Sequence, residues 1–306
     1  GNMDYLMADY LKSVTTSMLN DRLGELAQNA DCPFVQAYCY DGNYIFAKTK
    51  DAFTLIVVPK DGKTYEAISA AMRETLRAQQ FGFTATEFAR AKSNYMSSLE
   101  KVYTNRNKRE NSVYGDAYRD HFLSNEPIPS IEDQYAIMQQ VTPMIPVEAI
   151  NQGIAELINK NDSNLVVYSI NNEKEGAVYP TVDGIKKAIA DVRAEKLTAY
   201  VDNVKDEPLI KALPKKGTIK GEKENKTLGY KELTLSNGAR VLLKKTDFKD
   251  DEVMMTATSK GGASLLGEKD FANIKIFDDV IEASGLGEFS HTELEKALAG
   301  KQVSIS

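Results

Sequence analysis

The sequence predicts an α+β fold, in which an antiparallel sheet is flanked by long helices and the truncated start of a second, similar module follows. Residues 5–30 carry apolar side chains at helical spacing, and residues 52–59 form a run rich in β-branched residues. After residue 230 the turn signal Ser236-Asn237-Gly238 begins a strand pattern again. We therefore expect a first domain, a connector and an incomplete further domain, over residues 1–172, 173–229 and 230–306.

The first domain begins with a helix over residues 5–30. Its apolar residues form one buried stripe: Leu6, Tyr10, Val14, Met18, Leu19, Leu23 and Leu26. After Pro33 the period changes, and residues 34–40 and 43–48 are predicted to pair as a hairpin around Asp41-Gly42. The strand over 52–59 follows, and then a helix over 64–81 that Gly82 ends.

A second group of helices completes this domain. Thr84 and Glu87 have the spacing of a capping box, which starts a helix that runs past Tyr103. Further helices are expected over residues 112–122, from Ser130 through 140, and over 147–158. Residues 164–170, Asn-Leu-Val-Val-Tyr-Ser-Ile, are predicted to form a closing strand.

The connector is charged and punctuated by glycine and proline at both of its ends, so we expect those ends to be exposed and mobile. Between them, apolar residues at helical spacing within 181–200 predict one helix. Both a hinge and a tolerated spacer are consistent with this pattern. Beyond the hairpin at Asn237-Gly238, another strand is predicted to end at Gly261-Gly262.

Composition excludes several classes of protein. The chain has 306 residues, of which 42% are hydrophobic, and a net charge of −6 with basic and acidic residues interspersed. No basic stripe indicates nucleic acid, and the polar residues 105–111 are interpreted as a solvated helix face. No apolar run reaches the roughly 20 residues of a membrane span, and no signal-peptide order is present. Gly1-Asn2-Met3 resembles an added leader, so we expect that an upstream segment has been removed.

Metal ligands are scarce in this sequence. Zinc requires several imidazoles, thiolates or carboxylates that converge on one point, and the chain offers only His121, His291, Cys32 and Cys39 besides carboxylates. His291 follows Ser290, which is the expected N-cap of a short helix. The two cysteines are spaced as neither a redox motif nor a zinc knuckle, and two buried free thiols are expected.

Three motifs resemble those of the pitrilysin/insulinase family of zinc metallopeptidases. The hairpin Leu-Ser-Asn-Gly, its Lys-Lys-Thr-Asp-Phe-Lys continuation and the Gly-Gly ending are similar to the opening of a homology module of that family. Residues 81–92, Phe-Gly-Phe-Thr-x-x-Glu-Phe-x-x-Ala-Lys, resemble a recurring signature of the family, and residues 141–151 resemble its Val-Thr element. The resemblance implies a fragment whose first domain is of the C-terminal, non-catalytic type.

The resemblance also implies which site residues are missing. In the family's catalytic module, the helix after the Gly-Gly strand carries His-x-x-Glu-His, and here the corresponding positions are Asn273, Ile276 and Phe277. No catalytic residue and no metal ligand is therefore expected in this chain, and zinc is expected in the full-length parent if its first domain is active. Tyr65 is the one candidate for a substrate-binding tyrosine of the family, whereas Thr54 falls where an arginine is expected.

The function implied by the resemblance is that of a chamber wall in a metalloendopeptidase that degrades or processes peptides with a zinc-bound water. The expected partners are a peptide or unfolded polypeptide and an upstream catalytic domain or paralogous subunit, with no nucleic acid and no membrane span. Family habit indicates a periplasmic or exported protein. The alternatives are a catalytically dead paralogue that acts as a partner subunit, and an unrelated α+β binding domain.

Overall fold

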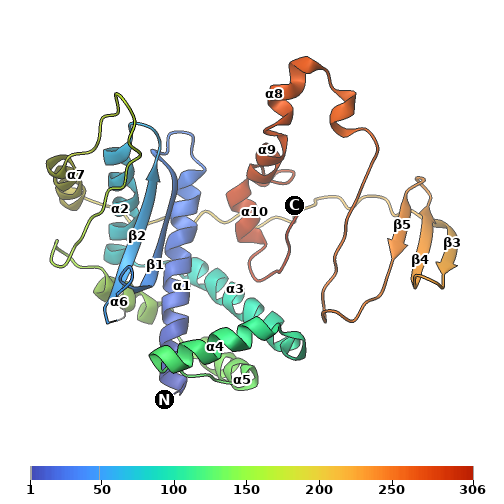
Figure 1. Cartoon of the computed structure of the whole chain (residues 1–306), viewed down its shortest axis with the longest axis horizontal. Helices are drawn as coiled ribbons and strands as arrows, with labels where there is room; N and C mark the ends of the chain where they lie inside the picture. The colour runs from blue at the N-terminus through green and yellow to red at the C-terminus, as the bar shows by residue number, and fades with distance from the viewer. Residues whose placement is uncertain (1, 48, 306) are drawn as a thin grey trace. The chain divides into compact units, whose positions relative to one another are not determined.

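The computed structural model describes residues 2–47 and 49–305, which form two compact units (Figure 1). The first unit contains the chain up to Leu99, then Pro129–Val204 and Glu295–Ile305; the second contains Glu100–Ile128 and Lys205–Leu294. The described residues combine helices with small antiparallel sheets, which confirms the α+β class.

The first unit consists of a two-stranded sheet with helices packed against it. Its elements are α1 (Asn2–Ala27), β1 (Phe34–Asn43), β2 (Asp51–Pro59), α2 (Thr64–Phe81), most of α3 (Ala85–Thr104), α5 (Ile131–Val141), α6 (Val147–Leu157) and α7 (Val182–Ala194). Helix α1 packs on β1, and α2 contacts β2, α1, α6 and α7 (Figure 1). The predicted stripe of α1 is buried, with Leu6, Tyr10, Val14, Met18, Leu19 and Leu23 each at most 1% exposed.

The hairpin predicted around Asp41-Gly42 is wrong, because β1 continues through these two residues. Asp41 pairs with Phe53 and Gly42 with Ala52, so the partner of β1 is β2. The chain reverses later, where the N–H of Tyr44 donates to the carbonyl of Lys50. Pairing between β1 and β2 outweighs the local turn signal of Asp41-Gly42, because continuing the strand gives both residues a cross-strand partner.

The boundary between α2 and α3 agrees with the prediction. Gly82 ends α2 with φ 72° and ψ −164°, a conformation that side chains strongly disfavour. The predicted capping box is present at the start of α3, because the N–H of Glu87 donates to Thr84 Oγ1 at 3.2 Å and the N–H of Thr84 donates to Glu87 Oε2 at 2.7 Å.

The closing strand predicted over residues 164–170 is wrong. This segment is extended but makes no strand pairing, and its apolar side chains are exposed. The hydroxyls of Tyr168 and Tyr44 lie 2.8 Å apart and connect this segment to the sheet region. A strand-like sequence forms a strand only where an adjacent edge offers hydrogen-bond partners.

The second unit contains a three-stranded antiparallel meander and short helices. Its elements are α4 (Asn111–Ser124), β3 (Ile219–Asn225), β4 (Tyr230–Leu235), β5 (Arg240–Leu243), α8 (Phe271–Ile274) and α9 (Phe277–Ala283), while α10 (His291–Ala297) crosses the division between the units. Strand order is β3-β4-β5. The Asn237-Gly238 turn joins β4 to β5 as predicted, but β3 was not expected, because its Lys/Glu-rich sequence has low strand propensity.

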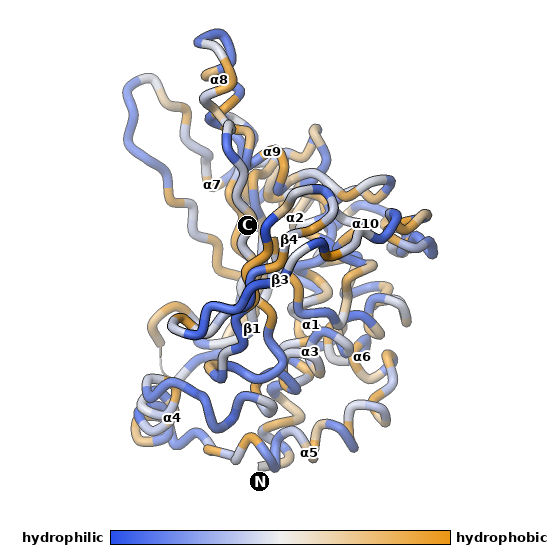
Figure 2. Tube along the Cα trace, turned by 90° about the vertical axis from the view of Figure 1, so that its right-hand side faces the viewer, coloured by the Kyte–Doolittle hydropathy of each residue, from blue (hydrophilic) through white to orange (hydrophobic). Residues whose placement is uncertain are grey.

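The strand predicted to end at Gly261-Gly262 is wrong, because residues 253–260 are exposed and outside any sheet. No helix among the described residues has the length and hydropathy needed to cross a membrane. Figure 2 agrees with this, because hydrophobic stretches along the chain are short and alternate with hydrophilic ones.

Candidate functional site

The positions that correspond to the family's zinc motif lie on two short helices. Asn273 lies in α8, whereas Ile276 and Phe277 lie at the N-terminus of α9, and all three are exposed. An inverted zinc motif needs its ligands on one continuous helical turn, and amide, sec-butyl and phenyl groups do not bind zinc. These residues do not fit a zinc ion. Among the described residues, no group of three or more histidine, cysteine or acidic side chains could hold a metal.

Tyr65 lies in the first turn of α2, and its phenol oxygen is engaged with the connector. It accepts a hydrogen bond from the N–H of Thr181 at 2.9 Å, and Thr181 itself caps α7 by accepting from the N–H of Gly184 at 3.0 Å. This hydrogen bonding with Thr181 lowers the pKa of Tyr65. Thr54 lies on β2 opposite Tyr40. A substrate-binding role for Tyr65 stays a prediction.

The remaining candidate ligands are separate from one another. His121 Nδ1 lies 2.7 Å from the carbonyl of Glu126 near the end of α4, and His291 begins α10, where Ser290 and Glu293 form the predicted cap. Cys32 and Cys39 are buried free thiols, as expected. Burial raises the pKa of Cys39 to about 12, so this thiol does not supply a nucleophile at neutral pH.

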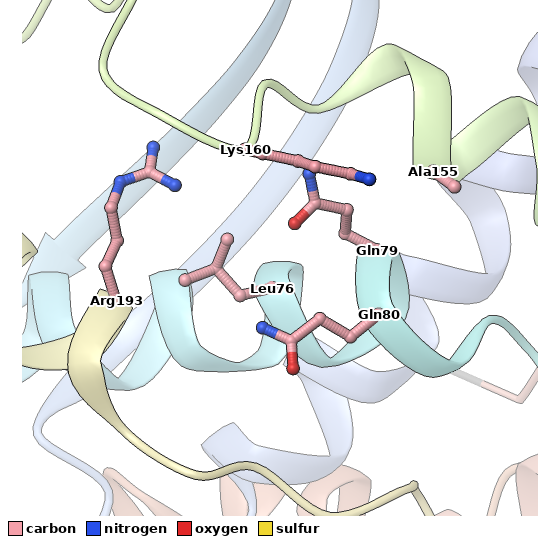
Figure 3. Close-up of a pocket in the computed structure, with 6 residues that line it drawn as sticks. All are labelled: Leu76, Gln79, Gln80, Ala155, Lys160 and Arg193. Atoms are coloured by element: carbon pink, nitrogen blue, oxygen red, sulfur yellow. The ribbon is translucent and has the colours of Figure 1, made fainter.

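An open depression lies between α2, α6 and α7 (Figure 3). It is lined by Leu76, Gln79, Gln80, Ala155, Lys160 and Arg193. The guanidinium of Arg193 is already bound, since it donates to Asp162 Oδ1 at 2.6 Å and to the carbonyls of Asn159 and Asn161. Gln79 donates to the carbonyl of Ile158. The lining holds no nucleophile with an adjacent base, so it provides no catalytic constellation.

A cluster of buried charged side chains in the first unit surrounds Arg22 of α1. Its side chain is 1% exposed and donates to both oxygens of Glu87, at 2.6 and 2.9 Å, to Glu74 Oε1 at 3.2 Å and to the carbonyl of Gly82 at 3.0 Å. The guanidinium carbon also lies 4.2 Å from the ring centroid of Tyr200. Arg22 therefore joins α1, α2, the start of α3 and the connector.

A second charged cluster adjoins this one at Asp202. Its carboxylate is 3% exposed and accepts both guanidinium nitrogens of Arg90 at 2.8 and 2.9 Å, the hydroxyl of Thr86, and Lys296 at 3.0 Å. Burial acts to raise the pKa of Asp202, but the hydrogen bonds from Arg90, Thr86 and Lys296 outweigh it and lower the pKa to about 2. Asp202 is thus an ionised anchor that fixes the connector to α3.

The charges of these two clusters bind one another. Every carboxylate named above has a cationic partner, and in the described residues the one buried side-chain polar atom without a hydrogen bond is the hydroxyl of Tyr10. Such a set of paired charges holds these elements together. Sequence reasoning identified Glu87 as a cap but missed Arg22 and Asp202, because their partners are more than 50 residues away.

Comparisons with known proteins show what this chain is similar to. No family model matches the chain. A zinc protease PQQL-like protein of Arabidopsis thaliana is 28% identical over 80% of this chain, and the probable zinc protease PqqL of Escherichia coli is 25% identical over 96% of it. The homologues of this chain are therefore PqqL-like zinc proteases, and the expected resemblance to the pitrilysin/insulinase type is confirmed.

Solved structures support the same fold. The crystal structure of the periplasmic protease PqqL from Escherichia coli matches 97% of this chain with a TM-score of 0.53 at 20% identity, over 32% of that protein. The structure of its first half matches 66% of this chain, over 42% of that structure, with a TM-score of 0.52 at 18% identity. The chain spans about a quarter to a third of the two sequence relatives, at 26% and 31% of their lengths.

Proposed function

We propose that this chain is a non-catalytic middle portion of a zinc-dependent metalloendopeptidase that degrades or processes peptides. The observation that carries the proposal is its similarity to PqqL-like zinc proteases, of which it spans 26% and 31%, together with the absence of a His-x-x-Glu-His motif from its sequence. In this proposal, the chemistry belongs to an upstream domain of the parent, and this chain supplies chamber wall and substrate-contact surface.

The proposed domain boundaries remain residues 1–172, 173–229 and 230–306, with two features that refine the connector. Helix α7 packs on α2, and Arg73 binds Glu195 through two hydrogen bonds of 2.6 and 2.7 Å, so the first part of the connector is attached to the domain before it. Strand β3 pairs with β4, so the last part belongs to the next sheet. A hinge is therefore proposed between residue 205 and β3.

Zinc in the parent would supply a bound water for hydrolysis, and no residue of this chain is assigned to bind it. The proposed partners are a peptide or unfolded polypeptide and the parent's catalytic domain. Export to the periplasm is proposed because the structure similar over 97% of this chain is described as a periplasmic protease. Tyr65 is kept as the candidate substrate contact.

The test compares this purified chain with the full-length parent. Zinc content is measured by elemental analysis, and peptidase activity with a quenched fluorescent peptide, with and without a chelator. We expect a parent that binds zinc and cleaves, beside a chain that does neither. A parent that is metal-free and inert would instead establish the catalytically dead partner subunit, and zinc bound by this chain would contradict the assignment of Asn273, Ile276 and Phe277.

A further inference from the structure

Lys296, on α10, belongs to the first unit and is surrounded there by hydrogen-bond acceptors. Its ammonium lies 3.0 Å from Asp202 Oδ1, 3.3 Å from Glu25 Oε2, 3.2 Å from the hydroxyl of Tyr200 and 3.3 Å from the carbonyl of Asn203. Only 11% of the side chain is exposed. The contact brings together residues 202 and 296, the points at which the chain leaves and re-enters the first unit.

Residues 297–302 are held by polar contacts and by half-buried side chains. The N–H of Gly300 donates to Asn94 Oδ1 at 2.6 Å, and Gln302 Nε2 lies 3.4 and 3.3 Å from the hydroxyls of Ser97 and Ser98 on α3. Helix α10 contributes no fully buried residue, and Ala297 and Leu298 are half-buried. Because apolar burial is the main source of stable docking, a segment with little of it depends on Lys296 for much of its attachment.

Removing Lys296 and removing Arg22 have different consequences for the carboxylates that each of them binds. Without Lys296, Asp202 keeps the two hydrogen bonds from Arg90 and that of Thr86, and Glu25 keeps the hydroxyl of Tyr200 at 2.6 Å. Without Arg22, Glu87 would lose its only ion-pair partner among the described residues, in a buried position. An uncompensated buried carboxylate costs far more than a lost third partner.

We propose that Lys296 is a detachable latch, which ties residues 295–302 to the first unit and can open while that unit stays folded. The ion pair at its centre is largely buried, so salt screens it only weakly. This inference does not depend on the proposed peptidase role.

Hydrogen exchange on the whole 306-residue chain tests the latch, with Lys296→Met as the variant and Lys301→Met as the matched control. Lys301 carries the same charge five residues later and is exposed. We expect exchange over residues 291–302 to rise roughly tenfold or more in Lys296→Met, with α1 and α2 unchanged, and no rise in Lys301→Met.

Three results would overturn the proposal. The first is unchanged exchange over residues 291–302 in Lys296→Met. The second is an equal rise in α1 and α2, which would mean that Lys296 supports the whole unit. The third is protection of residues 291–302 equal to that of α1 in the unmodified chain, which would mean that this segment opens only when the whole unit unfolds. This result needs no variant and holds even if Lys296→Met folds poorly.

Discussion

Arg22 and Glu87 form a bidentate ion pair whose side chains are 1% and 5% exposed, with Nε 2.6 Å from Oε1 and Nη2 2.9 Å from Oε2. The same carboxylate closes the capping box of α3, since Glu87 Oε2 accepts from the N–H and the hydroxyl of Thr84. One glutamate therefore sets the start of α3 and attaches that helix to α1.

Replacing Arg22 with methionine is expected to destabilise the first unit by about 3–5 kcal/mol, because Glu87 would remain buried without its ion-pair partner, whereas Glu74 keeps Arg77 at 3.0 Å. Urea denaturation followed by circular dichroism measures the change. Arg119→Met is the control, since Arg119 pairs with Asp116 and Asp120 on the surface and its loss should have little effect on stability. Equal losses in the two variants would contradict the expectation.

A side chain at position 82 should lower the unfolding free energy. A Cβ there would lie 2.3 Å from Cγ of Asn151, which bonds both the N–H and the carbonyl of Phe83. Gly62 is a matched control, because it has nearly the same φ, +71° against +72°, and open space around it. We expect Gly62→Ala to cost about 1–2 kcal/mol and Gly82→Ala about 2 kcal/mol more, measured as unfolding free energy. Similar costs would show that Asn151 can move aside.

Asp202 should make stability depend on pH in the acidic range. Its folded pKa of about 2 lies below the ordinary value of 3.8, so the ionised form stabilises the folded chain above pH 4 and this stabilisation is lost as pH falls toward 2. Between pH 7 and pH 3 the loss should be about 1 kcal/mol.

The variant Asp202→Asn removes this titration while retaining a similar shape. The difference in unfolding free energy between the unmodified chain and Asp202→Asn should therefore shrink by about 1 kcal/mol from pH 7 to pH 3, as measured by urea denaturation at each pH. A difference that stays constant across this range would show that Asp202 titrates alike in the folded and unfolded chains.

The variant Tyr65→Phe distinguishes two roles for this hydroxyl, the hydrogen bond to Thr181 and a contact with substrate. Loss of the acceptor for the N–H of Thr181 should loosen the N-terminus of α7, which would be seen as faster hydrogen exchange over residues 181–185. In the parent, kcat and KM for a peptide are expected to stay unchanged if this hydrogen bond is its only role. A raised KM with unaltered exchange would favour the substrate contact.

Local signals in the sequence predicted the helices well. The stripe of α1, the glycine that ends α2 and the Thr84–Glu87 box each depend on residues within a few positions of one another, and all three are present. Strand pairing was predicted less well, because it depends on distant partners. Residues 164–170 have a strand pattern without an edge to join, whereas β3 has a poor pattern but pairs with β4.

The charged clusters could not be predicted for a related reason. Arg22, Glu74 and Asp202 each resemble surface residues in the sequence, and only the fold brings them together across 52 to 112 positions from their partners. The absence of a zinc motif, in contrast, could be read directly, because His-x-x-Glu-His is a contiguous pattern and this sequence lacks it.

The reactivity of the buried Cys39 thiol can be used to follow the packing of α1 on the sheet. Cys39 lies on β1 against α1, where its backbone N–H donates to Asn20 Oδ1 and its thiol contacts the carbonyl of Thr16 at 3.7 Å. With a pKa raised to about 12 by burial, this thiol stays protonated and out of reach of alkylating reagents. The rate at which a maleimide modifies Cys39 would therefore measure how often α1 separates from the sheet.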